Sequence, residues 1–271
     1  VKAGKTLALG TGSSLGAAGS TVSLLDSASQ LHFTGISGVS SVGSTISGTG
    51  TVTQSGAGTT ILLADNSYAG TTTVSGGTLQ VGNAGTTGSL GAGDVTMSNN
   101  ANLSYVLAEA TTIANNISGA GNVSAAITGT SSDLTVNRTI ALTGGTVNLN
   151  ADRNLSVTQA ISTTNGTSSA VMLVAGKPAS AGTAAGGDVT ISGSGSVSAG
   201  ASGRVTFMTG SLAGSTGVGA VTGNNRYNSD EVDTNYTTAL TSGTYTIYRE
   251  QPMVTVQVNN ASKTYDGLGF T

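Results

Sequence analysis

Acidic side chains are the residues of this sequence that could carry out acid–base chemistry. Two positioned carboxyl groups suffice for a glycosidase, one acting as the acid and the other as the base or nucleophile. The carboxylates before residue 224 stand singly, without a local pair and with few basic or aromatic residues near them to hold a sugar. They are Asp26, Asp65, Asp94, Glu109, Asp133, Asp152 and Asp188. This spacing favours turn-forming and solubilising roles, and it predicts a protein that is not an enzyme.

Histidine chemistry has a single candidate, His32 in the sequence QLHFTG. A histidine-centred site needs a nucleophile or further ligands around the ring. The sequence holds no HExxH motif and no second histidine. We therefore interpret His32 as an ordinary strand residue, and we predict no catalytic and no cofactor-binding residues.

One acidic cluster offers oxygen ligands for a metal ion. Asp230, Glu231 and Asp233, together with Asn228, are close enough in sequence to hold one Ca²⁺, which prefers oxygen ligands. A solvated loop tip is the favoured alternative. GAGDVTM and GGDVTIS each place one Asp after glycines, but the nine-residue period of a calcium-binding roll is missing.

The composition predicts folded β-structure with a narrow core. Glycine accounts for 42 of the 271 residues, proline for only 2, and charged residues for 8%, whereas disordered chains carry high net charge and few β-branched residues. Aromatic residues make up only 4%. Stacked Val, Ile, Leu and Ala are therefore expected to form the core in place of Phe and Trp.

The charge balance and the lack of cysteine exclude several classes of protein. A formal net charge of −3 and a pI of about 4.9 leave no basic footprint, so no nucleic-acid partner is predicted. Without cysteine there is no disulfide framework and no thiolate metal site. The longest apolar run, residues 170–175, suits one buried strand and is far too short for a membrane-spanning helix. The strand pattern is already under way at Val1 and continues to the end, which favours a segment of a longer protein.

Residues 48–82 contain four short β-type runs separated by glycine, aspartate and asparagine corners. Strands of about four residues do not form a stable sheet alone, but each can stack on an equivalent strand in the next coil of a solenoid. The runs are Thr49–Thr53, Thr60–Leu63, Thr71–Val74 and Thr78–Val81. Alternation in residues 128–208 continues the pattern, with the following side chains expected to point inward: Leu134, Val136, Ile140, Leu142, Val147, Leu149, Leu155, Val157 and Ile161.

The stretch 48–82 resembles the autotransporter-associated β-strand repeat, of approximate form GxGxLTKxGxGTLxLxGxNxYxGxTxVxxGTLxVG. Gln54 replaces the usual basic residue, and Asp65 precedes the asparagine of the repeat. The resemblance implies a parallel β-helix in a bacterial surface protein. The matching positions are Gly48, Gly50, Gly56, Gly58, Leu62, Asn66, Tyr68, Gly70, Thr72, Val74, Gly77, Thr78, Leu79, Val81 and Gly82.

Two later regions resemble other surface-protein families. NLNADRNLSVTQAIST (148–163) and residues 186–211 are similar to the repeats of filamentous haemagglutinin-type adhesins, and RYNSDEVDTNYT to the segment that closes such a region. Five of the seven tyrosines lie beyond residue 224. The alternation at Val254, Val256 and Val258, followed by KTYDG at Lys263–Gly267, resembles the first strand of YDG-type (MBG-type) immunoglobulin-like modules.

Together these patterns predict an all-β protein: a right-handed parallel β-helix over residues 1–223, a Tyr-rich closing segment over 224–251 and the first strand of an Ig-like module over 252–271. About ten coils are expected, with a rise of ~4.8 Å per coil. Such a terminal segment would cover the open edge that every solenoid must protect.

The resemblances imply a non-enzymatic, adhesin-like passenger or stalk at the surface of a Gram-negative bacterium. Its expected partners are a glycan or protein of a host, cell surface or matrix, and an outer-membrane secretion pore during export. Two alternatives stay open at this point. One is a subunit of an extracellular filament that assembles by strand addition, and the other is a β-helical carbohydrate-active enzyme.

Overall fold

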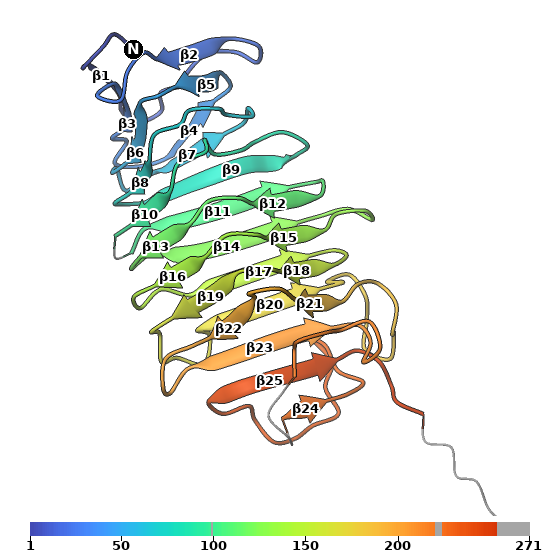
Figure 1. The fold of residues 1–271 in the computed structure, drawn as a ribbon. Coiled ribbons are helices and arrows are strands. Elements are labelled where there is room, and N and C mark those ends of the chain that lie inside the picture. Colours follow the sequence, from blue (N-terminus) through green and yellow to red (C-terminus); the bar gives the residue numbers. More distant parts are fainter. Residues whose placement is uncertain (99, 220–223, 254–271) are drawn as a thin grey trace, which may run out of the picture.

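The structure is a computed structural model that describes residues 1–98, 100–219 and 224–253. Every regular element in these ranges is a β-strand, and every named strand pair is parallel. The strands stack in about ten turns into a rod, with β1 and β2 at one end and β24 and β25 at the other (Figure 1). The fold is thus a parallel β-solenoid, as predicted. Within the described ranges there is no helix long and apolar enough to cross a membrane.

The strands form three faces of the rod, two of them continuous and the third present in only some of the coils. Face A is one nine-stranded sheet. Its strands, in order, are β1 (Thr6–Leu9), β3 (Gln30–Phe33), β6 (Thr51–Gln54), β8 (Thr72–Val74), β10 (Val95–Met97), β13 (Ile117–Gly119), β16 (Ile140–Leu142), β19 (Ala160–Thr163) and β22 (Ser196–Ser198).

Face B is a ten-stranded sheet. It contains β4 (Val39–Val42), β7 (Thr59–Leu62), β9 (Thr78–Gly85), β11 (Asn102–Leu107), β14 (Asn122–Ile127), β17 (Val147–Ala151), β20 (Val171–Ala175), β23 (Arg204–Thr209), β25 (Gly243–Tyr248) and β24 (Asn225–Arg226). Face C is interrupted, with two short sheets: β2 (Thr21–Leu24) and β5 (Thr45–Gly48), then β12 (Thr111–Ile113), β15 (Leu134–Val136), β18 (Leu155–Val157) and β21 (Val189–Ile191).

The core is a set of aliphatic columns that run along the rod. Side chains alternate across each strand, and the parallel register places one inward residue above the next, as in Leu103, Val123, Val147 and Val171 of face B. Burial of these columns removes apolar surface from water while the backbone ladder satisfies the peptide groups between coils. All nine side chains predicted to point inward are at most 2% exposed.

The coil length is regular along most of the rod and then increases. In the regular part, Val52 pairs with Thr72 of the next coil, and Ile117 pairs with Ile140. Near the C-terminal end, Val205 pairs with Thr244, which lies almost twice as far along the chain. The extra residues form a loop at 176–188 and a longer excursion between β23 and β25.

Most predicted strands are present, with ends displaced by a few positions. The run predicted at Thr49–Thr53 is β6 (Thr51–Gln54), because Gly48 and Gly50 form the preceding corner, and β4 was not predicted. The apolar stretch 109–117 forms β12 and the start of β13. The ladder of face B passes residue 223, where the closing segment was predicted to begin, since β25 pairs with β23. The predicted Ig-like strand, with Val254 and Lys263–Gly267, lies outside the described residues.

Candidate functional site

The carboxylates considered for acid–base chemistry are held apart at corners between coils. Asp65 Oδ1 accepts a hydrogen bond from Gly88 N at 2.9 Å, and Asp152 Oδ2 accepts one from Gly129 N at 2.8 Å. Both bonds link neighbouring coils. These carboxylates satisfy backbone amides where the ladder turns a corner, which is the turn-forming role predicted from their spacing.

Two further aspartates have bonds that favour their ionised form. Asp26 Oδ1 accepts hydrogen bonds from Ser29 Oγ at 2.7 Å and Gly4 N at 3.1 Å, and these bonds lower the pKa of Asp26. Asp133 forms a bidentate pair with Arg153, at 2.7 and 2.5 Å, and this pair lowers the pKa of Asp133. Both carboxylates are therefore occupied by structural partners.

The remaining candidates for acid–base chemistry are also dispersed. Asp94 Oδ1 accepts a hydrogen bond from Asn116 Nδ2 at 3.0 Å, and Asp188 Oδ1 accepts one from Ser211 N at 2.7 Å. Glu109 is exposed. His32 lies in β3, where its Nε2 is 2.7 Å from Ser55 Oγ. None of these contacts joins two carboxylates.

The proposed calcium ligands are not brought together. Asp230 Oδ1 accepts hydrogen bonds from Val232 N at 2.7 Å and Asp233 N at 2.6 Å, while Oδ2 accepts one from Ala181 N at 2.8 Å. Partial burial opposes ionisation of Asp230, but these bonds outweigh it and lower its pKa. In the part of the chain that the structure describes, no group of three or more His, Cys, Asp or Glu side chains is arranged to hold a metal ion. The cluster builds a turn and fastens it to the loop 176–188.

Buried amide side chains bridge face C where its strands are interrupted. Asn66 accepts a hydrogen bond from Ile46 N at 2.7 Å and donates to Ser89 O at 2.6 Å. Asn115 donates to Gly91 O at 2.7 Å. Asn66 is 9% exposed and Asn115 is 6% exposed, so their bonds to backbone atoms of neighbouring coils replace ladder bonds in a place shielded from water.

The departure from the repeat at Gln54 has a similar role. Gln54 is 1% exposed, donates to Gly56 O at 2.7 Å and accepts from Thr60 Oγ1 at 2.6 Å. Tyr68 is also fully buried, and its hydroxyl is 2.7 Å from Thr72 Oγ1. The repeat is therefore held by internal polar bonds as well as by its aliphatic column.

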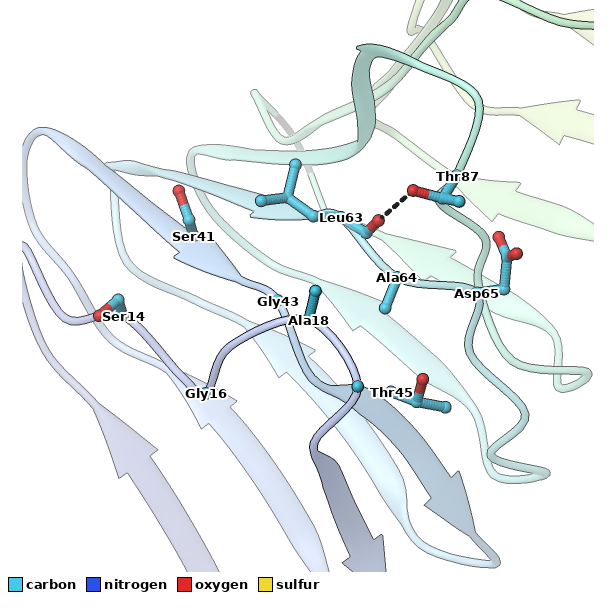
Figure 2. A pocket seen from close by; sticks show the side chains of 11 residues that line it. Ser14, Gly16, Ala18, Ser41, Gly43, Thr45, Leu63, Ala64, Asp65 and Thr87 are labelled. Carbon is cyan, nitrogen blue, oxygen red and sulfur yellow. Dashed lines mark hydrogen bonds between the residues drawn. The ribbon is translucent and has the colours of Figure 1, made fainter.

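A hollow of about 480 Å³ lies between coils near the N-terminal end (Figure 2). Its walls are small residues, hydroxyls and one carboxylate, that of Asp65. Thr87 Oγ1 donates to Leu63 O at 2.7 Å along one side. A single carboxylate without a basic or aromatic neighbour cannot divide the roles of acid and base. The residues lining this hollow include Ser14, Gly16, Ala18, Ser41, Gly43, Thr45, Leu63, Ala64, Asp65 and Thr87.

The Tyr-rich excursion folds back over the outer surface of face B. We call residues 224–242 the arm. Val174, Met208 and Ile247 stand in register on neighbouring strands and alternate with inward residues, yet they are at most 9% exposed. They form a second apolar cluster, outside the solenoid core, with Met172 and Leu240 packed against it. The arm thus covers the outward face of the last strands.

The sequence contains a signal that the outer face of β20 is covered. The run 170–175 is apolar throughout instead of alternating, and a continuous apolar run is typical of a strand buried on both faces. The run forms the predicted buried strand, β20, and Val174 on its outer face belongs to the second apolar cluster.

Arginine and tyrosine side chains gather on the arm. The guanidinium of Arg226 lies 5.0 Å from the ring centroid of Tyr236 and donates to Thr238 O. Tyr227 and Tyr248 stack, with ring centroids 5.2 Å apart. Next to them is a hollow of about 290 Å³, lined by Asn224, Asn225, Arg226, Tyr236, Thr238, Ala239, Thr241 and Tyr245.

Arg249 connects the last described coil to the loop 176–188. It is 1% exposed and donates to Ala175 O at 2.6 Å and Gly187 O at 2.9 Å. Burial lowers the pKa of Arg249, and nearby carboxylates offset part of that effect. A buried cation bonded to two carbonyls holds the C-terminal region in place.

Comparison with known proteins finds one match to a protein family. Residues 52–81 match the family described as Passenger-associated-transport-repeat, inside the stretch 48–82 that the sequence analysis singled out. No curated protein and no solved structure matches the chain.

Proposed function

We propose that the chain is a rod-shaped part of the passenger of an autotransporter-type protein, exposed on the surface of a Gram-negative bacterium. It acts without catalysis, as an adhesin-like stalk that carries binding surfaces away from the cell. The match of residues 52–81 to the Passenger-associated-transport-repeat supports this proposal, and so does the stacking of that repeat in register within the solenoid.

The geometry suits a spacer. About ten coils with a rise of ~4.8 Å per coil give a rod roughly 50 Å long. Outward positions on face A are mostly small and uncharged, as in Thr53, Thr73, Thr96 and Ser118, which share one column. The absence of cysteine means that no disulfide can form within the chain before export is complete.

Surface exposure is tested on intact cells that make the natural protein. Antibodies raised against residues 1–219 should label unpermeabilised cells, and protease added outside should remove the label while a periplasmic marker survives. Labelling only after permeabilisation would contradict the proposal.

The non-enzymatic role is tested with a panel of polysaccharides incubated with the purified chain. No depolymerisation is expected, because the acidic residues bond to structural partners at separate corners. Activity that is lost on one Asp or Glu substitution would overturn this part of the proposal. Electron microscopy of the same sample should show isolated short rods, whereas filaments would favour the structural-subunit alternative.

A further inference from the structure

The hollow on the arm combines a cation with a partly exposed aromatic ring, whereas the groove between coils that contains Arg138 has only the buried ring of Tyr105. The arm rests on a buried apolar cluster that includes Met208 and Ile247, and Arg204 Nη1 donates to Leu240 O at 3.1 Å. Both contacts fix the arm on face B. The hollow is therefore mounted on rigid strands, which keeps its side chains in one arrangement before any ligand arrives.

Arg226 is positioned but not neutralised. Stacking on Tyr236 and the bond to Thr238 O hold the guanidinium in place, and its remaining N–H groups have no protein acceptor within the described ranges. The ion pair found in the described ranges is Asp133–Arg153, far away on the solenoid. A planar guanidinium held by an aromatic ring presents its free edge as a two-pronged donor, which matches a carboxylate.

The electrostatic character of the hollow is positive, although the chain as a whole is acidic. The hydroxyl of Tyr245 bonds to Thr241 Oγ1 at 2.8 Å and accepts from Thr241 N at 3.3 Å. These bonds, together with the nearby charges of Arg226 and Arg204, lower the pKa of Tyr245. A negative group placed here is attracted by two cations that have no carboxylate partner in the described residues.

The rest of the lining suits a polyhydroxylated ring. Asn224, Asn225 and Thr241 supply amide and hydroxyl groups, and Tyr236, 37% exposed, supplies an aromatic surface. Among the residues that the structure describes, the buried Oδ1 atom of Asn225 has no hydrogen-bond partner. A volume of about 290 Å³ is at the lower end of small-ligand sites and suits one sugar ring. The hollow of Figure 2 has hydroxyls and Asp65 but no cation or aromatic ring among its lining residues.

We propose that this hollow binds an acidic sugar: a single pyranose ring that carries a carboxylate, as a terminal or branch residue of an extracellular glycan. Arg226 binds the carboxylate, Tyr236 packs against the ring, and Asn224, Asn225 and Thr241 bond to the ring hydroxyls. The inference deepens the proposed function and rests on it only for access to such glycans. Binding by the purified chain is measured without that assumption.

Calorimetric titration and ligand-detected NMR test the proposal with the full chain. Glucuronic acid and N-acetylneuraminic acid are the probes, galactose is the neutral control, and inorganic phosphate is the control for a simple anion site. We expect at least one of the two acidic sugars to bind, with affinity that falls as NaCl is raised, since salt screens the charge interaction. No binding by either acidic sugar, or equal binding of galactose or of phosphate, would overturn the proposal.

Two substitutions of the same kind separate the site from a general charge effect. Arg226→Gln should weaken binding by about tenfold or more, the loss expected when a charge-assisted two-pronged bond is removed. Arg138→Gln removes an exposed arginine on the solenoid and should leave the affinity unchanged. If circular dichroism shows that Arg226→Gln is misfolded, Arg226→Lys is used in its place. Lysine keeps the positive charge but lacks the planar two-pronged donor, so binding should weaken at least severalfold. Unchanged affinity in the folded Arg226 variant would refute the role of Arg226.

Failure here and failure of the proposed function are distinguishable. If antibodies against the chain label intact cells but no acidic sugar binds, the proposal of a surface stalk is kept and the proposal of a sugar site is rejected. If an acidic sugar binds but the chain is not exposed at the cell surface, the sugar site is supported and the proposed function is rejected.

Discussion

The shaft, residues 1–209, and the arm are stabilised in opposite ways. In the shaft, the side chains that stabilise the fold are mainly aliphatic and point inward, as Leu149 does between Ala125 and Leu173. Polar side chains such as Asp65, Asn66 and Asn115 bond to the backbone of neighbouring coils. In the arm, tyrosines, Arg226 and acidic residues lie outside the solenoid, and side-chain bonds and an apolar cluster hold the arm to coils that are already complete.

The difference teaches where function can be added to such a fold. Each coil of the shaft contacts only its neighbours and must keep its register, so its inward positions tolerate little change. An excursion between two strands leaves the register intact, since β25 pairs with β23 after a long detour of the chain. Chemically richer side chains can therefore gather on the arm without disturbing the core.

The largest effect is expected from a cavity in the shaft. Leu149→Ala should lower the free energy of unfolding by about 3 kcal/mol, because Leu149 is fully buried and a Leu-to-Ala change in a core costs about 2–5 kcal/mol. Urea unfolding followed by circular dichroism measures the loss. Leu212→Ala, at a position 56% exposed, is the control and should change little. A loss below about 1 kcal/mol for Leu149→Ala would mean that the coils relax around the cavity.

A slightly smaller effect, confined to the C-terminal region, is expected for Arg249→Ala. Two buried carbonyls lose a charged donor, and bonds to charged groups contribute about 1.5–3 kcal/mol each. Relief of the buried charge offsets part of this, so we expect a net loss of about 2–3 kcal/mol. Hydrogen exchange should accelerate in residues 176–188 and 224–250 but not in 51–151. Uniform acceleration along the rod would show that arm and shaft unfold as one unit.

Close approach between coils in the shaft gives the next prediction. Gly48 has φ of +100°, and a Cβ atom there would lie 2.0 Å from Leu24 O. Gly48→Ala should therefore cost about 2 kcal/mol, from the disfavoured conformation and from displacement of the neighbouring coil. Gly85→Ala is the matched control, since a Cβ atom at Gly85 meets nothing within 4 Å. Thermal unfolding of both variants measures the difference, and equal melting temperatures would contradict the close packing.

The smallest effect should appear in acid, and first in the arm. The pKa of Asp230 is lowered in the folded state, so its bonds stabilise the fold above the ordinary value of 3.8 and are lost as the pH falls below it. Protonation weakens the bond to Ala181 N that ties the arm to the loop 176–188. Below pH 3.8, exchange in 224–242 should therefore rise before exchange in the shaft.

Two substitutions check the origin of the acid effect. Asp230→Asn should show the faster exchange already at neutral pH, with less change on acidification. Asp133→Asn removes a carboxylate of the shaft whose pKa is also lowered. Its partner Arg153 is 43% exposed, so the pair contributes about 1 kcal/mol or less, and the arm should not respond. An arm that loosens equally in both variants would rule out a local effect of Asp230.

The sequence was sufficient to predict the shaft because its determinants are local and repeated. Alternation at positions such as Val147, Leu149 and Leu155 specifies which face is buried, and glycine corners specify where each run ends. The repeat also marked Asn66 and Tyr68, although their partners became visible only with coils in register. Gln54 looked like a departure from the repeat and proved to be a buried link within a corner.

The arm could not be derived in the same way. Arg249 bonds to the carbonyl of Ala175, 74 residues away, and every residue possesses a carbonyl, so no residue type in the sequence marks the acceptor. The concentration of tyrosine identified the region as different in character. Its position on face B depends on which long loops meet, as the Asp230 bond to Ala181 N shows, and spacing along the chain does not encode that meeting.

The alignment of the ladder has a mechanical consequence. Hydrogen bonds between coils run along the rod axis, and each coil contacts only the coils before and after it. A pulling force applied to one end of the chain therefore acts on one coil at a time. The hydrogen bonds of that coil break before those of the next coil are loaded. Under tension the rod should lengthen in steps of roughly one coil. At the C-terminal end, the contacts of the arm and of Arg249 should break first.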